Sequence, residues 1–124
     1  MHLFGTEERR LSLNKYFKKN EAEKYAFYKI PKALFTNEKY KTVSTDAKML
    51  YGLLLDRMYL SARNGWVDRY GRVYQFFTIK QGQELLHFGH DKIIRLFGEL
   101  EKADLIQRNR HGQGKANIIY LKKF

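Results

Sequence analysis

The stretch HFGHDKIIRLFGELEKADLIQRNRHGQGKANIIY, residues 87–120, decides the fold. In its first half, apolar residues recur at the three- and four-residue spacings that place one face of a helix against a core. These apolar positions are Ile93, Leu96, Phe97, Leu100 and Ala103. The other face is largely polar and basic, and the pattern breaks near Asp104. We therefore predict an amphipathic helix from His90 to about Ala103.

The second half of this stretch predicts a two-stranded ribbon. An extended segment begins at Leu105, the sequence HGQGK at 111–115 provides two glycines for a turn, and residues 117–122 return as a second strand. A helix followed directly by a ribbon with a basic tip is typical of the second half of a winged helix-turn-helix, whose helix can lie in the DNA major groove. A helix and a hairpin also occur together in proteins whose exposed side is only solvated.

A long helix is predicted over residues 45–63, TDAKMLYGLLLDRMYLSAR. Ser44 or Thr45 can cap its N-terminus, the charge of Asp46 suits the helix dipole, and Asn64-Gly65 is a C-terminal signal. Apolar residues occupy most of its circumference. Such a helix is expected at the centre of a domain, or in a dimer interface as well as the core.

Further elements lie between the long helix and the helix at His90. Residues 66–77, WVDRYGRVYQFF, predict a hairpin that turns at 68–71. Thr78 should cap a helix over about 79–88, although a glycine within that helix makes its length uncertain. This helix and the next are joined by a tight turn that contains glycine, which is the arrangement of a helix-turn-helix.

The chain before the long helix divides into two parts. Residues 1–24 are polar and charged and predict a partly ordered N-terminal arm, with a short helix around 13–24. Residues 25–30 are aromatic enough for a short strand, and Pro31 should begin a short helix, because proline is favoured in a first helical turn. We therefore expect an arm over 1–24 and an α+β domain over 25–124, a winged helix-turn-helix with the additional arm and β-hairpins.

The charge balance favours an anionic partner. The 124 residues contain 24 Lys and Arg against 13 Asp and Glu, which gives a formal net charge of +11 and a pI near 9.8. Residues 105–124 contain five Lys and Arg residues and no acidic one. Nucleic acid is the commonest partner of so basic a chain, although many soluble domains are also basic.

Other features of the composition exclude several classes of protein. Cysteine is absent, which excludes disulfides and thiolate chemistry and fits a reducing compartment. No apolar run approaches the roughly 18 residues that span a bilayer, and the N-terminus lacks the apolar core of a signal peptide. We expect a soluble cytoplasmic protein with no membrane partner.

Motifs of enzymes are missing from the sequence. His87 and His90 stand three residues apart, but no third metal ligand accompanies them and Gly89 should break the helix. A rolling-circle nuclease would require a His-x-His motif beside a tyrosine, and none is present. The sequence GQG at 112–114 lacks the strand, loop and helix of a nucleotide site. We expect no catalytic residues, no metal and no cofactor.

Specific blocks of sequence carry a resemblance to a known family. They are FYKIPKALFTNEKYKTVSTDAKMLYGLLLDRM at 27–58 and NGWVDRYGRVYQFFT at 64–78, followed in order by ELL, KIIRLFGELEKADLI and GKANIIYLKKF. Together they resemble the RepA_N family of plasmid replication initiators from Gram-positive bacteria, over roughly residues 25–124. The YKIPKALF and STDAKMLYGLLLDRM blocks are the most specific.

This resemblance implies a function. Members of the family bind repeated sites (iterons) in the plasmid origin, start replication and recruit host replication proteins. Their N-terminal domain resembles a winged helix that binds double-stranded DNA as a homodimer, and higher oligomers that pair origins are compatible with the family. A separate C-terminal part is associated with host-factor contacts. Because this chain stops at Phe124, we expect it to be the isolated DNA-binding domain, with the host-factor part missing.

Candidate base contacts lie on the outer face of the helix that begins at His90. Arg95 can bond guanine O6 and N7 bidentately, and Lys92 can reach guanine or phosphate. His90 stands at the N-terminal end of the same face. Ile94 suits a thymine methyl group, but it could equally pack on a neighbouring helix.

Candidate backbone contacts lie in two other places. Lys80 and Gln81 begin the preceding helix, where free backbone N–H groups help to hold phosphate. The ribbon supplies the residues expected at the DNA backbone or minor groove, which are Arg108, Arg110, His111, Gln113 and Lys115.

Two alternative functions remain open from the residues. A winged-helix transcriptional repressor would bind one inverted repeat at a promoter, whereas an initiator binds clustered direct repeats in an origin. A winged helix used only for protein contacts would show no steep dependence of DNA affinity on salt concentration.

Overall fold

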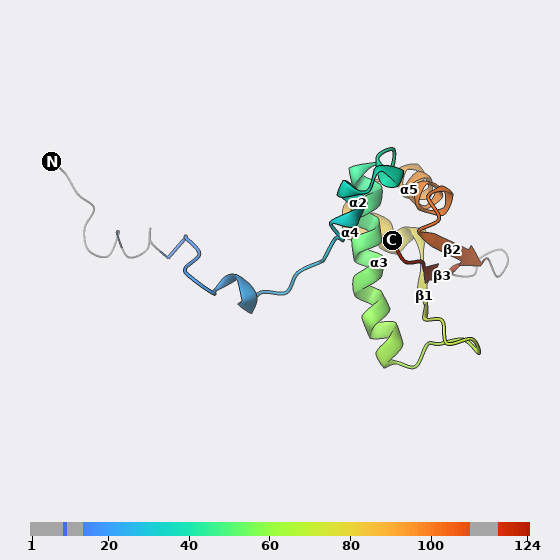
Figure 1. Ribbon diagram of the computed structural model, residues 1–124, viewed down its shortest axis with the longest axis horizontal. Coiled ribbons are helices and arrows are strands. Elements are labelled where there is room, and N and C mark those ends of the chain that lie inside the picture. The colour runs from blue at the N-terminus through green and yellow to red at the C-terminus, as the bar shows by residue number, and fades with distance from the viewer. Residues whose placement is uncertain (1–8, 10–13, 110–116) are drawn as a thin grey trace.

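Helices α3 and α5 pack on one face of a three-stranded antiparallel sheet (Figure 1). The computed structural model describes residues 9, 14–109 and 117–124. Its elements, in chain order, are η1 (Ala22–Lys24), α2 (Ala33–Thr36), η2 (Glu38–Tyr40), α3 (Thr45–Arg63), β1 (Tyr74–Phe77), α4 (Ile79–Leu86), α5 (His90–Lys102), β2 (Ile106–Asn109) and β3 (Asn117–Leu121). The strand order is β1-β3-β2. This is the α+β winged helix-turn-helix that the sequence predicts.

Helix α3 lies at the centre of the domain and has the predicted bounds. The hydroxyl oxygen of Ser44 accepts a hydrogen bond from the backbone N–H of Ala47 at 3.1 Å, which caps the first turn. Leu50 and Leu54 are fully buried, whereas Tyr59 is 60% exposed near the other end. The N-terminal half of α3 therefore supplies the core, and its C-terminal half extends along the sheet into solvent (Figure 1).

The core fills the space between α3, α5 and the sheet. The apolar face of α5 is buried as predicted, with Ile93, Leu96 and Leu100 fully buried. Phe97 of α5 meets Phe77 of β1 edge to face, with ring centroids 5.9 Å apart. This contact fixes α5 against the first strand.

Helix α4 begins with the cap that the sequence predicts at Thr78. The Thr78 hydroxyl oxygen accepts from the Gln81 N–H at 3.0 Å, and the Gln81 side-chain oxygen accepts from the Thr78 N–H at 2.9 Å. These reciprocal bonds form a capping box. The helix ends earlier than predicted, at Leu86, because His87 adopts a left-handed backbone with φ of 59°.

A glycine allows α4 and α5 to approach closely. Gly82 is buried in α4, and a Cβ added there would lie 3.0 Å from Cγ2 of Ile93 in α5. Because glycine lowers helix propensity, the sequence alone does not fix the length of this helix. The structure supplies the reason for it, because a larger residue would push the two helices of the helix-turn-helix apart.

The predicted strand over residues 25–30 is wrong. The segment is extended but pairs with no described strand, and Tyr25, Phe27 and Tyr28 are more than half exposed. Aromatic composition favours a strand only where a sheet edge and a packing face are available. The end of this segment instead lies against Gly52 of α3, where an added Cβ would meet Ile30 at 2.9 Å.

In the N-terminal arm, the structure describes residue 9 and residues 14–24. Over 14–24 its residues are almost all exposed, and Figure 1 shows the segment leading away from the body of the domain. The short helix predicted around 13–24 is reduced to η1, a single 3-10 turn. The boundary between arm and domain at residue 25 stays a prediction.

The predicted hairpin over residues 66–77 forms only in part. Its turn is confirmed, because the Gly71 N–H donates to the Asp68 carbonyl at 3.0 Å. The two arms of the hairpin share a single bridge, between Val67 and Val73. β1 pairs along its whole length with β3 instead of with the other arm of the hairpin. Because β3 also pairs with β2, the partner of β1 is a strand of the wing.

Candidate nucleic-acid interface

Polar contacts at two positions of α5, an ion pair and a pair of hydrogen bonds, join it to the N-terminus of α3 and fix its orientation. The ammonium nitrogen of Lys92 lies 2.8 Å from a carboxylate oxygen of Asp46. Two turns later, the Glu99 carboxylate accepts from the Ser44 backbone N–H at 2.9 Å and from the Ser44 hydroxyl at 3.0 Å. Because Lys92 and Glu99 are seven residues apart, both lie on one side of α5. On the helical wheel, the buried residues of α5 lie to one side of Lys92 and Glu99, and exposed residues lie to the other side.

The free side of α5 presents a contiguous exposed surface at helical spacing. Five of its exposed residues are Asp91, Ile94, Arg95, Gly98 and Lys102, and the exposed Glu101 beside them is bonded to Arg108. Ile94 is 42% exposed, so a large part of its side chain is available to a ligand. Arg95 makes no ion pair with any described residue, which leaves its guanidinium available. We call these five residues the α5 face.

His90 and Lys92 differ in how they are placed. His90 is the exposed first residue of α5, with Nδ1 3.2 Å from a carboxylate oxygen of Asp91. Lys92 is half-buried, and besides its pairing with Asp46 its ammonium lies 3.8 Å from the ring centroid of Phe88. The sequence did not indicate this structural role of Lys92, and a DNA contact by Lys92 stays a prediction.

Lys80 and Gln81 are neighbours at the start of α4, but they differ in exposure and in hydrogen bonding. Lys80 is exposed in the first helical turn, beside the backbone N–H groups that could hold an anion. Gln81 is half-buried, and the capping box occupies its side-chain oxygen. Only the amide NH₂ of Gln81 is left to donate to a ligand.

Arg108 has contacts inside the fold that the sequence does not indicate, and a DNA contact by Arg108 stays a prediction. Its Nε–H donates to the Glu101 carboxylate at 2.6 Å, and its guanidinium lies 5.2 Å from the ring centroid of Phe97. The Arg108 side chain is only 8% exposed. Strand alternation turns it toward α5, where an acid and a ring hold it. The other predicted wing contacts (Arg110, His111, Gln113 and Lys115) lie outside the described residues.

Sequence reasoning missed Gly98, which lies in the middle of the α5 face. A Cβ added at Gly98 would meet no atom within 4 Å, so packing inside the domain does not require glycine there. Glycine in the middle of a helix is destabilising. A glycine in the middle of a predicted helix, on its exposed face, is the signal that could have identified this position. Without a side chain there, another molecule can approach the α5 backbone closely.

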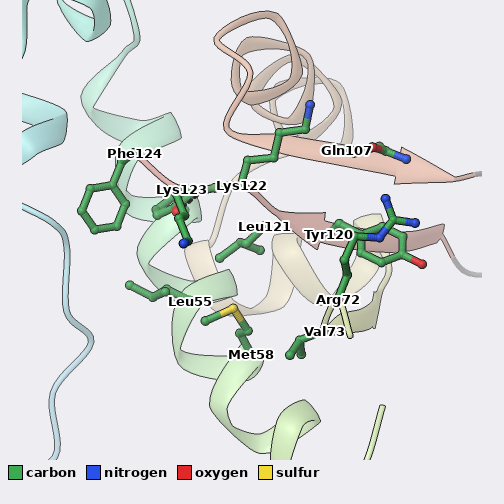
Figure 2. A pocket seen from close by; sticks show the side chains of 11 residues that line it. Leu55, Met58, Arg72, Val73, Gln107, Tyr120, Leu121, Lys122, Lys123 and Phe124 are labelled. Atoms are coloured by element: carbon green, nitrogen blue, oxygen red, sulfur yellow. Dashed lines mark hydrogen bonds between the residues drawn. The ribbon is translucent and has the colours of Figure 1, made fainter. Parts of the chain in front are cut away.

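A pocket of about 360 Å³ lies away from the α5 face, between α3, the start of β1 and the last residues of the chain (Figure 2). Leu55, Met58 and Leu121 make its lining largely apolar. The Tyr51 hydroxyl donates to the Lys122 carbonyl at 2.7 Å, and burial, helped by the nearby Tyr40, raises the pKa of Tyr51 to about 12. Tyr51 therefore stays a protonated donor at neutral pH. None of the predicted DNA contacts that the structure describes lines this pocket.

Two features are absent from the described residues. In residues 14–109 and 117–124, no three His, Asp or Glu side chains gather as a metal site would require. Within the same part of the chain, every helix is too short or too polar to cross a membrane.

Comparison with known sequences gives a family match and a relative. Residues 26–124 match the family described as the replication initiator protein A (RepA) N-terminus. A protein of Lactobacillus helveticus named "41 kDa protein" is 39% identical, over 77% of this chain and 29% of its own length. The chain thus spans less than a third of that relative.

Comparison with solved structures gives similar folds at the same level of identity. Three of them are described as the N-terminal domain of a DNA-binding protein, a Rep–DNA complex and an MDR initiator. Each is 39% identical and covers 87% of this chain, with 82%, 83% and 85% of the respective solved chain covered. The TM-scores are 0.72, 0.73 and 0.70 in the same order.

Proposed function

The chain belongs to the family of replication initiator protein A (RepA) N-terminal domains, and from this premise we propose that it binds double-stranded DNA at repeated sites of a plasmid origin to initiate replication. The observation that carries the proposal is the α5 face. It is an exposed surface with an arginine that makes no ion pair with a described residue, on the helix of a winged helix-turn-helix that would enter the major groove. A protein with 39% identity and the same fold is described as a Rep–DNA complex.

The α5 face suits base recognition for two chemical reasons. Arg95 has the planar donor fork that bonds guanine O6 and N7, and Ile94 offers an apolar contact for a thymine methyl group. The polar contacts of α5 with Asp46 and Ser44 hold these side chains on a fixed helix, so little ordering is left to occur on binding. In this arrangement Gly98 lets the sugar-phosphate backbone or a base edge approach the helix.

Phosphate contacts would surround this reading helix. Lys80 and the free N–H groups at the start of α4 would hold one phosphate. Arg110, His111, Gln113 and Lys115 of the wing would follow the adjacent backbone or minor groove. Lys102 is exposed in the last turn of α5 and adds a positive charge on the same side.

The assembly around DNA is part of the proposal. The domain would bind its repeats as a homodimer, and higher oligomers would pair sites. Host replication proteins would be recruited through the part of the full-length relatives that this chain does not span. The domain itself would carry no catalytic activity and need no cofactor, so origin DNA incubated with it and a divalent metal should stay uncut.

Fluorescence anisotropy on labelled duplexes tests the proposal. The targets are plasmid origin repeats, a scrambled duplex and a single inverted repeat, each at 50 and 200 mM salt. We expect tightest binding to the direct repeats, and a fall in affinity of about a thousandfold or more between the two salts if six to ten phosphates are contacted. Preference for the inverted repeat would favour a repressor. Weak binding to all three with a shallow salt slope would favour a protein-binding winged helix.

A further inference from the structure

The outer face of the sheet carries aromatic side chains that the proposed function does not use. In β1, Gln75 and Phe77 are buried toward the helices, so Tyr74 and Phe76 point to the other side. In β3, Ile119 is buried in the same way and Tyr120 points outward beside Tyr74. Phe76 is 40% exposed on this face. Apolar rings are thus presented to solvent on the side of the sheet that no described helix covers.

These rings form a continuous row. The centroids of Trp66 and Phe76 are 5.5 Å apart, those of Phe76 and Tyr74 are 5.8 Å apart, and those of Tyr74 and Tyr120 are 6.2 Å apart. Trp66 reaches the row from the loop before β1 and is 36% exposed. The three separations all exceed the roughly 3.4 Å between nucleotides along one strand of a duplex.

Two arginines continue the row beyond Tyr120. The guanidinium of Arg72 lies 5.0 Å from the ring centroid of Tyr120, where Figure 2 shows the two side chains together. Arg72 also lies 5.2 Å from the ring centroid of Tyr70, and Arg69 lies 4.8 Å from the same ring. Tyr70 is 67% exposed. Rings and cations therefore alternate from the sheet onto the turn at residues 68–72.

Asp68 holds this turn in place. One of its carboxylate oxygens accepts from the backbone N–H groups of Tyr70 and Arg72, both at 2.9 Å, and the other accepts from the Arg72 Nε–H at 2.8 Å. Although its surroundings desolvate the carboxyl, these hydrogen bonds lower the pKa of Asp68 to about 2. Asp68 stays ionised at neutral pH, and its bonds position Arg72 over the row.

We propose that this row is a binding site for single-stranded DNA, separate from the α5 face. Its members, here called the sheet platform, are Trp66, Tyr70, Tyr74, Phe76 and Tyr120 with Arg69 and Arg72. Unpaired bases stack on aromatic side chains whatever their sequence, and neighbouring cations hold the backbone. A duplex hides the faces of its bases, so the sheet platform would select unpaired strands. Its wide ring spacing suits a strand stretched beyond duplex spacing.

The charge of the platform favours a polyanion over a second copy of the chain. Asp68 is the acid among these residues, and its carboxylate is already bonded to Arg72. Two copies packed through this face would bury Arg69, which makes no ion pair with a described residue, and a charge buried without a partner at an interface is destabilising. A nucleic-acid strand supplies the opposite charge along its whole length. A dimer through this face is therefore an outcome of the test that would overturn the proposal.

The single tryptophan of the chain makes the test direct. Trp66 is the one tryptophan in the sequence and belongs to the platform, so its fluorescence reports on this face alone. We expect oligo(dT) of about 20 nucleotides to quench Trp66 fluorescence saturably, and a duplex of equal length to quench it far less. Oligo(U) under the same conditions distinguishes DNA from RNA, and tighter binding of oligo(U) would overturn the assignment to DNA. An unquenched Trp66 at saturating oligo(dT), or equal quenching by the duplex, would also overturn the proposal.

Matched variants separate this site from the α5 face. Phe76→Ala should weaken oligo(dT) binding about tenfold to a hundredfold and leave binding of repeat duplex unchanged. Arg95→Ala should do the reverse, so failure of the duplex-binding proposal would not be mistaken for failure here. Tyr28→Ala removes an aromatic residue that is 60% exposed outside the platform and should change neither.

Two further measurements keep the result decisive. If the melting curve shows that Phe76→Ala unfolds, Arg69→Gln replaces an exposed side chain of the platform and should weaken oligo(dT) binding by itself. Sedimentation of both variants reports the oligomeric state. A loss of oligo(dT) binding with an unchanged oligomeric state supports the proposal, whereas conversion of a dimer to monomer by either variant contradicts it.

Discussion

Lys92 of α5 and Asp46 of α3 form an ion pair of 2.8 Å between the candidate reading helix and the central helix. Both side chains are about a third exposed, so solvent weakens the pair. The same contact draws a cation predicted to bind DNA toward a carboxylate. The pair therefore stabilises the fold modestly and makes the charge of Lys92 less available to phosphate.

Asp46→Asn tests this relationship. We expect the free energy of unfolding to fall by less than about 1 kcal/mol, because solvent screens the pair. We expect affinity for duplex DNA to rise, because Lys92 is released and a negative charge is removed. Urea denaturation and anisotropy measure the two effects. Unchanged or weaker DNA binding would show that Lys92 acts only within the fold, and Asp56→Asn, a change on an exposed part of α3, is the control.

Gly98→Ala should change stability and DNA binding in opposite directions. Alanine has the higher helix propensity and meets no atom within 4 Å, so the free energy of unfolding should rise by about 0.5–1 kcal/mol. Affinity for duplex DNA should fall, because the added methyl group lies in the α5 face. Unchanged affinity in a stabilised variant would mean that DNA does not approach α5 closely at this point.

Gly82→Ala is the matched change on the buried side of the helix-turn-helix. Here the new methyl group would lie 3.0 Å from Ile93, so α4 and α5 must move apart. We expect the free energy of unfolding to fall by about 1–3 kcal/mol, the usual range for overpacking. Chemical denaturation of the two alanine variants side by side checks the opposite signs. A stable Gly82→Ala variant would show that the helices can separate without loss.

Arg108→Ala should destabilise the domain without weakening DNA binding. It removes a charged hydrogen bond to Glu101 and a cation–ring contact with Phe97, together worth about 1–3 kcal/mol. Denaturation should show the loss, while anisotropy below the melting temperature should give unchanged affinity and salt slope. A shallower salt slope would show that Arg108 contacts phosphate, as the sequence predicts. Lys123→Ala, on an exposed side chain near the pocket, controls for loss of one positive charge.

The local elements could be predicted because their signals are local. The long helix, its Ser44 cap, the Thr78 cap and the apolar face of α5 each depend on residues within a few positions of one another. The wing followed from the glycines and the strand pattern beside it. Its strands lie where the sequence placed them.

What could not be predicted depends on contacts between distant residues. Tyr25 to Ile30 has the composition of a strand, but whether a sheet edge is free for it is decided elsewhere in the chain. The pairing of β1 with β3 joins Tyr74 to Tyr120 across 46 positions, so the neighbouring hairpin was the better local choice. For the same reason, the contacts of Arg108 could not be predicted. The sequence places Arg108 on a basic strand but does not show that Glu101 bonds to it.

Whether the α5 face reads bases is decided by comparing the affinities of Arg95→Ala and of the unchanged domain for two duplexes. One carries the origin repeats and the other a scrambled sequence of equal length, at one fixed salt concentration. If the α5 face reads bases, affinity for the repeats should fall by about 1–3 kcal/mol and affinity for the scrambled duplex much less, so that base preference relaxes. An equal loss on both duplexes would mean that Arg95 contacts only the backbone, and no loss on either would place the DNA away from α5.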